Sequence, residues 1–118
     1  MTKTEFLLSL EIQEIDFNLV RKIEHKYGFE IPEIAQKIIS ASTESIFFEK
    51  NWRTLSVEEI LDASADLHVD FEGQKILPVI DTGENDFIVY HANNDAWSKF
   101  NIIEECYFKV KKSFYEFF

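Results

Sequence analysis

Apolar positions in the first third of the chain follow the period of an α-helix. Asp16 is a suitable N-cap before this stretch, and Gly28 after it suits the left-handed position at a helix end. The apolar residues between them recur at helical spacing: Phe17, Leu19, Val20, Ile23 and Tyr27. The pattern therefore predicts a helix from about residue 16 to residue 28.

A second helix is predicted directly afterwards. Pro32 suits its first position, because the amide group there makes no hydrogen bond within the helix. Glu33 suits its first turn, where the helix dipole favours an acidic residue. Its apolar face consists of Ile34, Ala35, Ile38 and Ile39. Residues 1–15 carry a mixed pattern that fits either a short helix or an irregular arm.

From Ser45 the composition becomes typical of strands, with short β candidates at 46–48 and 52–55. Ser56 followed by Glu59 has the spacing of a capping box, which predicts the start of another helix. Residues 66–74 alternate between apolar and polar positions, so they fit a strand or an extended loop.

Three strands are predicted at 75–81, 86–92 and 96–102, separated by turn-rich segments. Pro78 donates no ladder hydrogen bond, so its part of the strand should be an edge or a bulge. Ser113 is placed to cap a short amphipathic helix over 114–118. This order predicts one α+β domain over residues 1–118, mainly an antiparallel β-sheet with helices packed against it.

The composition fits a packed domain of this kind. The chain has 118 residues, 46% of them hydrophobic, and a single cysteine, Cys106, which excludes an intrachain disulfide. No apolar run reaches the roughly 18–20 residues of a membrane-spanning helix, and no signal-peptide pattern is present. We therefore expect a cytoplasmic protein.

The net charge of −10 is concentrated in one part of the chain. Between Thr54 and Ser98 there are ten acidic residues and one basic residue, Lys75. Such a balance argues against direct binding to nucleic acid or to a membrane surface, both of which attract basic residues. The segment is either a solvated face or a binding surface for a basic protein. Candidate contact residues on this second interpretation are Glu58, Glu59, Asp62, Asp70, Glu72, Asp81, Glu84, Asp86, Asp95 and Trp97.

No pattern of catalytic, metal-binding or cofactor-binding residues stands out. The histidines His25, His68 and His91 are far apart in sequence, and Cys106 lies among acidic residues that raise a thiol pKa. Residues 81–86 look like a calcium loop, but a hairpin turn explains them better. Three glycines are too few for a phosphate-binding loop. We therefore expect no catalytic residues, no metal and no cofactor.

Four motifs occur in an order that resembles a known family. They are Ile31-Pro32-Glu33-Ile34, the Leu55–Ile60 step, the Ile76–Ala92 segment ILPVIDTGENDFIVYHA, and the closing Ser113–Phe118 segment SFYEFF. This order is similar to that of the SUKH superfamily, which comprises bacterial toxin-immunity proteins related to the yeast Smi/Knr regulators. The resemblance covers about residues 16–118.

The resemblance implies a binding protein, not an enzyme. Many bacterial members of the family bind and neutralise a cognate toxin domain, often a nuclease. The first hypothesis is therefore an immunity protein that uses its acidic segment to cover a basic toxin domain, as a monomer or weak homodimer. The alternative is a regulatory or scaffolding module of the same fold without a toxin partner. Trp52 and Trp97 flank turns, so each fits either the core or the rim of an interface.

Overall fold

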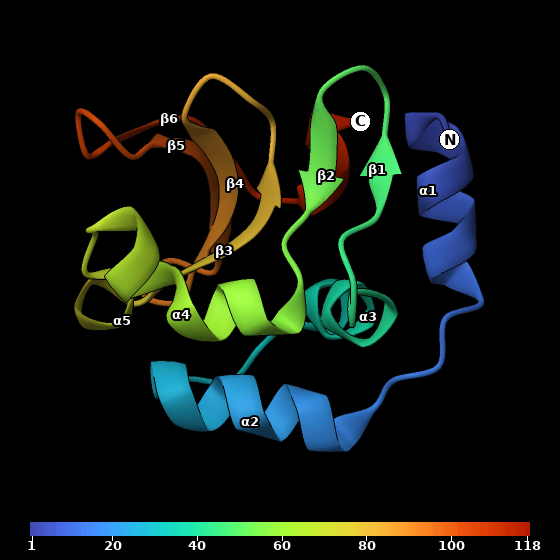
Figure 1. The fold of residues 1–118 in the computed structure, drawn as a ribbon, viewed down its shortest axis with the longest axis horizontal. Coiled ribbons are helices and arrows are strands. Elements are labelled where there is room, and N and C mark those ends of the chain that lie inside the picture. Colours follow the sequence, from blue (N-terminus) through green and yellow to red (C-terminus); the bar gives the residue numbers. More distant parts are fainter.

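The computed structural model describes all residues from 1 to 118 (Figure 1). It contains five α-helices, six strands and a short 3-10 helix, η1. The helices are α1 (Lys3–Glu11), α2 (Phe17–Tyr27), α3 (Glu33–Ala41), α4 (Val57–Leu67) and α5 (Phe71–Gln74), with η1 at Phe114–Phe117. The strands are β1 (Phe47–Phe48), β2 (Trp52–Thr54), β3 (Ile76–Asp81), β4 (Asp86–His91), β5 (Ala96–Asn101) and β6 (Cys106–Lys111).

The strands form one open sheet in the order β1-β2-β3-β4-β5-β6, and every neighbouring pair is antiparallel. Consecutive strands are joined by short turns, except that α4 and α5 lie between β2 and β3. The turns of the β1–β2, β3–β4 and β5–β6 hairpins therefore lie at the same end of the sheet. Ile102 N donates a hydrogen bond to Asn85 O between two of these turns, 3.0 Å away. The predicted α+β domain with an antiparallel sheet is confirmed.

Alternate residues of β4 and β5 face opposite sides of the sheet. Phe87 and Phe100 are paired across the strands and face the side where Phe71 of α5 lies 5.9 Å from Phe100, measured between ring centroids. Tyr90 and Trp97 are paired on the other side, where Phe114 of η1 lies 5.1 Å from Trp97. Both sides are covered, and 26 buried residues form one hydrophobic cluster.

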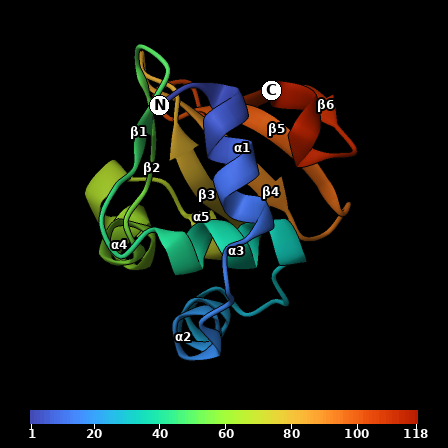
Figure 2. The same ribbon diagram turned by 90° about the vertical axis from the view of Figure 1, so that its right-hand side faces the viewer.

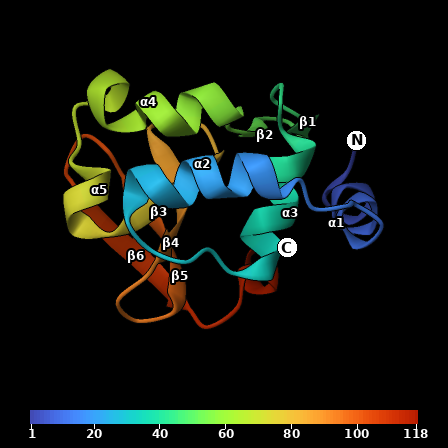
Figure 3. The same cartoon turned by 90° about the horizontal axis from the view of Figure 1, so that it is seen from below.

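The helix boundaries follow the capping residues closely. Asp16 accepts a hydrogen bond from Asn18 N at 3.0 Å, and Gly28 ends α2 with a left-handed φ of 81°. Pro32 is the N-cap of α3 and not its first residue, one position earlier than predicted. The helices α2, α3 and α4 lie together across one end of the sheet, as the view from below shows (Figure 3). No helix has the length and apolar character needed to cross a membrane.

The N-terminal segment is a helix, which resolves the choice that its pattern left open. Thr2 and Glu5 form a capping box at the start of α1. The Phe6 ring of α1 stacks on Phe48 of β1 with ring centroids 4.1 Å apart, and Phe118 stacks against both rings. This aromatic cluster holds α1 beside the β1–β2 hairpin and the C-terminal turn (Figure 2).

The structure corrects one prediction about elements, contains one strand that was not predicted, and confirms the bulge at Pro78. Residues 66–74 are neither a strand nor an extended loop, because they end α4 and then form α5 after a left-handed residue, His68. The strand β6 was not predicted, although Phe108 and Val110 alternate with Lys109 and Lys111; its side chains are mostly exposed on both sides. The bulge expected at Pro78 is present, since the register shifts between Pro78 and Ile80.

The edge strand β6 is itself irregular. Trp97 of β5 pairs with Lys111, but Lys99 pairs with Phe108, so the register shifts by one residue between these two pairs. Lys109 lies at this shift and has a φ of 54°. An extra residue in this conformation is typical of a β-bulge, which bends the strand away from a straight edge. The exposed edge of the sheet thus combines a bulge with the lysines Lys109, Lys111 and Lys112.

Candidate functional site

The helix α4 carries a row of acidic side chains on its outer surface. Glu58, Asp62 and Asp66 are four residues apart and are all exposed, so they lie along one side of the helix. Neither a hydrogen bond nor an ion pair engages any of these three carboxylates. Repulsion within the row is therefore not compensated by a basic residue of the same chain.

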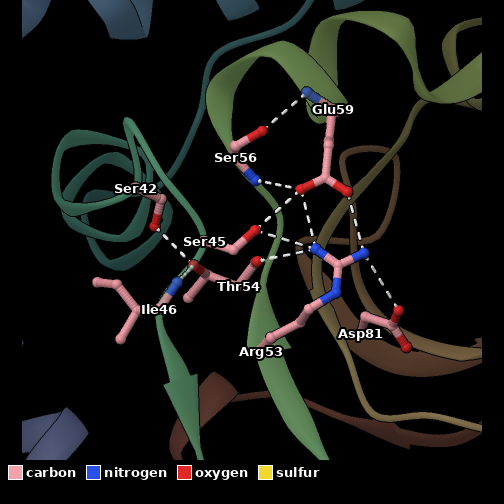
Figure 4. A network of polar contacts seen from close by, with 8 residues as sticks. All are labelled: Ser42, Ser45, Ile46, Arg53, Thr54, Ser56, Glu59 and Asp81. Atoms are coloured by element: carbon pink, nitrogen blue, oxygen red, sulfur yellow. Dashed lines mark hydrogen bonds and ion pairs between the residues drawn. The ribbon is translucent and has the colours of Figure 1, made fainter.

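Arg53 connects α4 to the sheet on the inner side of this helix (Figure 4). Its Nη1 and Nη2 donate to the two carboxylate oxygens of Glu59, each at 2.9 Å, and Nη2 also lies 3.4 Å from Asp81 Oδ2. Nη1 donates to Ser45 Oγ at 3.0 Å, and Ser45 in turn donates to Glu59 Oε1 at 2.9 Å. The paired geometry fixes the start of α4 relative to β2 and β3.

The network shifts the ionisation of both partners. Burial alone would raise the pKa of Glu59, but hydrogen bonds from Arg53, Ser56 and Ser45 outweigh it and lower the pKa to about 2. Hydrogen bonds to Glu59 likewise raise the pKa of Arg53. Glu59 therefore stays ionised at neutral pH, with both oxygens already occupied.

The β3–β4 hairpin supplies a second group of acidic side chains. Asp81 Oδ1 accepts a hydrogen bond from Gly83 N at 2.8 Å, which tightens the turn. Asp86 Oδ1 accepts from Asn101 Nδ2 at 2.9 Å, whereas Glu84 is exposed and has no partner. The turn is an ordinary hairpin, as expected, with Glu84 and Asn85 both in the left-handed region.

An open cavity of about 110 Å³ lies between α4 and the strands β2, β3 and β4. Arg53, Leu55, Glu59, Ala63, Asp66, Leu67, Asp81 and Phe87 line it. Because Asp66 and Asp81 line the same cavity, the row on α4 and the β3–β4 hairpin belong to one surface. We call this surface the acidic face and define it as Glu58, Asp62, Asp66, Asp81 and Glu84. Asp86 is excluded, because it alternates with Phe87 along β4 and therefore faces the opposite side of the sheet.

Three other acidic candidates have local structural contacts. Asp70 is the N-cap of α5 and accepts a hydrogen bond from Gly73 N at 2.9 Å. Glu72 is half-buried. Burial of Tyr27 is the main cause that raises the pKa of its hydroxyl, and the negative charge of Glu72 is the second cause. Asp95 accepts from Tyr90 Oη at 2.8 Å and lies in the β4–β5 turn. That turn is at the opposite end of the sheet from the β3–β4 turn, so Asp95 does not belong to the acidic face.

Trp97 was a wrong choice for a contact residue. It is only 4% exposed, and its ring packs between Tyr90 and Phe114 on the side of the sheet opposite Phe87. A large aromatic ring completely enclosed by the core offers no surface to a partner. Trp52 is half-buried, and the ammonium of Lys3 lies 4.0 Å from its ring centroid.

The side chains of His91 and Cys106 lie outside the acidic face and have local contacts. His91 is buried, and its Nε2 lies 2.6 Å from Ser98 Oγ. Desolvation and the Glu104 carboxylate raise the pKa of the Cys106 thiol, as its acidic neighbours predicted. No group of three His, Cys, Asp or Glu side chains is placed to hold a metal ion.

No protein-family model, curated protein or solved structure matches this chain. The acidic face therefore has to be interpreted from its own geometry. The sequence analysis selected four of its five residues but did not select Asp66, although its spacing from Glu58 and Asp62 is a usable signal. It also missed Arg53 and the apolar lining of the cavity, which depend on contacts between distant segments.

Proposed function

We propose that this chain is a non-enzymatic immunity protein of the SUKH type, which binds and neutralises a basic bacterial toxin domain in the cytoplasm. The observation that carries the proposal is the row of Glu58, Asp62 and Asp66, three exposed carboxylates with no basic partner in the chain. Like charges four residues apart destabilise a helix, so the repulsion between these three carboxylates opposes the stability of α4. A basic partner would relieve the repulsion on binding.

The positions of the four family-like motifs support the proposal. Pro32, Ser56 and Ser113 are the N-caps of α3, α4 and η1, and the Ile76–Ala92 segment contains the β3–β4 hairpin. Each motif thus sits where the chain changes direction or begins an element. Two of the motifs, the Leu55–Ile60 step and the Ile76–Ala92 segment, therefore contain the start of α4 and the hairpin that carry the acidic face.

The charge of the acidic face suits a toxin that acts on nucleic acid. A nuclease needs lysine and arginine side chains to hold the phosphate backbone, so its substrate surface is basic. A surface of opposite sign speeds the encounter between two proteins and disfavours partners of the wrong charge. Covering the substrate surface of such a toxin would neutralise it without any chemical step.

The first experiment is co-expression with the toxin encoded beside this gene. We expect cells to survive and the two proteins to elute as one complex from a sizing column. Continued killing together with separate elution would refute the proposal. Survival of cells that express only the neighbouring gene would show that this gene encodes no toxin, and that would equally count against the proposal.

Charge reversal tests the surface itself. Asp62→Lys combined with Glu84→Lys changes two exposed carboxylates that make no internal bond, so the fold should be kept. The control, Glu11→Lys with Glu14→Lys, changes the net charge equally on exposed residues outside the acidic face. We expect the first pair to slow association at least about tenfold at low salt and to flatten its salt dependence. Equal effects of the two pairs would exclude the acidic face as the contact surface.

A further inference from the structure

We propose that the cavity between α4 and the sheet is an anchor site for one arginine side chain of the protein partner. This inference rests on the proposed function, because it assumes a basic protein bound to the acidic face. The cavity would be the position of the central contact, and arginine would be the residue type that the partner inserts there. Three properties of the cavity carry the inference: its walls, its charge and its rigidity.

The walls of the cavity suit the aliphatic part of a long side chain. Leu55, Ala63 and Phe87 are almost completely buried, and Leu67 adds a half-buried side chain at the end of α4. An apolar cavity of roughly 150 Å³ can hold a benzene ring, so about 110 Å³ accommodates the methylene stem of one side chain. Arginine buries such a stem against apolar walls while its charged end stays near polar groups.

The charge of the lining selects a cation. Three carboxylates, Glu59, Asp66 and Asp81, face one guanidinium, Arg53, so the lining has a net charge of −2. Both Glu59 oxygens are taken by Arg53. The free capacity therefore belongs to Asp66, which has no partner, and to the remaining lone pairs of Asp81.

These two carboxylates favour arginine over lysine. Asp66 comes from α4 and Asp81 from β3, so they reach the cavity from different elements. A guanidinium spreads five donors over a planar fork and can bond two carboxylates at once, whereas an ammonium is a compact and strongly hydrated point charge. Arginine is also more weakly hydrated, so its partial burial costs less.

The cavity is held in shape before a partner arrives. Arg53 joins α4 to β2 and β3, and Gly83 N holds the Asp81 carboxylate from the other side. No buried polar side-chain atom in the chain lacks a hydrogen-bond partner, so no unpaired buried group competes for the contacts of Arg53 and Asp81. A preformed site avoids the cost of ordering side chains on binding.

A titration without the partner tests the cavity directly. The probe is N-acetyl-arginine-methylamide, added to isotopically labelled protein and followed by the amide signals of Ala63, Leu67 and Phe87. We expect saturable shifts with this probe and at least about tenfold weaker binding of the uncharged citrulline analogue, because a charge-assisted hydrogen bond is lost. Absence of shifts at these residues, or equal binding of the two probes, would overturn the inference.

Two variants of α4 separate the cavity from general acidity. Asp66→Asn removes a carboxylate that lines the cavity, and Asp62→Asn removes the same charge one turn earlier, outside it. We expect the first to weaken arginine-probe binding about tenfold and the second to change it less than about twofold. An equal loss of probe affinity in both variants would contradict an arginine anchor. Tighter binding of the corresponding lysine probe than of the arginine probe would contradict it as well.

The same variants keep this inference distinct from the proposed function. If the toxin complex forms and both variants weaken it equally, the acidic face binds the partner but the arginine anchor is wrong. If the arginine probe binds the cavity and no toxin complex forms, the proposed function fails and the cation site stands. A selective loss of toxin affinity in Asp66→Asn supports both.

Discussion

Arg53 is the residue on which the geometry of the site depends. Its guanidinium reaches the start of α4 through Glu59, the strand β3 through Asp81 and the loop before β1 through Ser45. The capping box between Ser56 and Glu59 was predictable, because its spacing is local. The bidentate pairing was not, because Arg53 and Glu59 lie on different elements and meet only after α4 has docked on the sheet.

The depressed pKa of Glu59 gives the stability of the protein a defined dependence on pH. Its folded-state pKa of about 2 lies below the ordinary value of 4.5, so the folded state favours the ionised carboxylate. The contribution is complete above about pH 4.5 and disappears as the pH falls towards 2. We expect Glu59→Gln to lower the free energy of unfolding by about 1–2 kcal/mol at neutral pH, a range reduced because the carboxylate is partly exposed.

Urea unfolding of both proteins between neutral and strongly acid pH measures this effect. The difference between wild type and Glu59→Gln should shrink as the pH falls below 4.5. Glu58→Gln is the matched control, since Glu58 is the adjacent residue, is exposed and makes no bond. A difference that stays constant over the whole range would show that the carboxylate acts through packing and not through its charge.

At the scale of elements, α4 places its charges in two opposite ways. Glu58 and Glu59 lie in the first turn, where acidic residues favour the helix dipole. Asp66 lies in the last turn, where the dipole disfavours an acid, and it follows Asp62 by four residues. The helix is therefore stabilised at its start and destabilised at its end, next to the cavity.

This asymmetry predicts unequal effects of two similar substitutions. Asp66→Asn should raise the free energy of unfolding by about 0.3–1 kcal/mol, because it removes both repulsive contributions. Glu58→Gln should change it much less, because the favourable dipole contribution that it removes offsets the repulsion from Asp62. Urea unfolding at low and high salt measures both, and high salt should reduce each effect. An equal or larger gain in Glu58→Gln would contradict this description of α4.

The elements that the sequence predicted share one property, which is that their signals are local. The helix α2 has Asp16 and Gly28 at its ends, and the β3–β4 hairpin has a turn between two apolar strands. The strand β6 and the helix α5 have only short signals. Phe108 and Val110 alternate with Lys109 and Lys111 over just four residues, and α5 is only four residues long. The cavity was equally unpredictable, because its lining comes from three parts of the chain.

At the scale of the whole molecule, the two edges of the sheet differ. The β1 edge lies beside α1, where Glu49 N donates to Met1 O at 2.8 Å. The β6 edge is open and carries exposed Tyr107 and Val110. Its bulge at Lys109 and the neighbouring lysines are features that discourage pairing with a second chain.

We therefore expect the free protein to be a monomer, because the irregular β6 edge blocks edge-to-edge pairing. Sedimentation velocity over a range of concentrations measures this. Removal of Lys109 should straighten β6 and produce association that increases with concentration. Lys109→Gly is the control, because glycine keeps the left-handed bulge without the charge and should leave the protein monomeric. A stable dimer of the wild type would contradict the expectation.

The order of the strands in the sheet has a consequence for the time course of folding. Every strand pairs with its neighbour in sequence, so most of the sheet forms from contacts that close short loops. Such local topology favours a folding rate faster than that of all-β proteins with distant strand pairs. The stacking of Phe6 on Phe118 joins the most distant parts of the chain. We expect this contact to form after the rate-limiting step, so that Phe6→Leu would accelerate unfolding much more than it slows refolding.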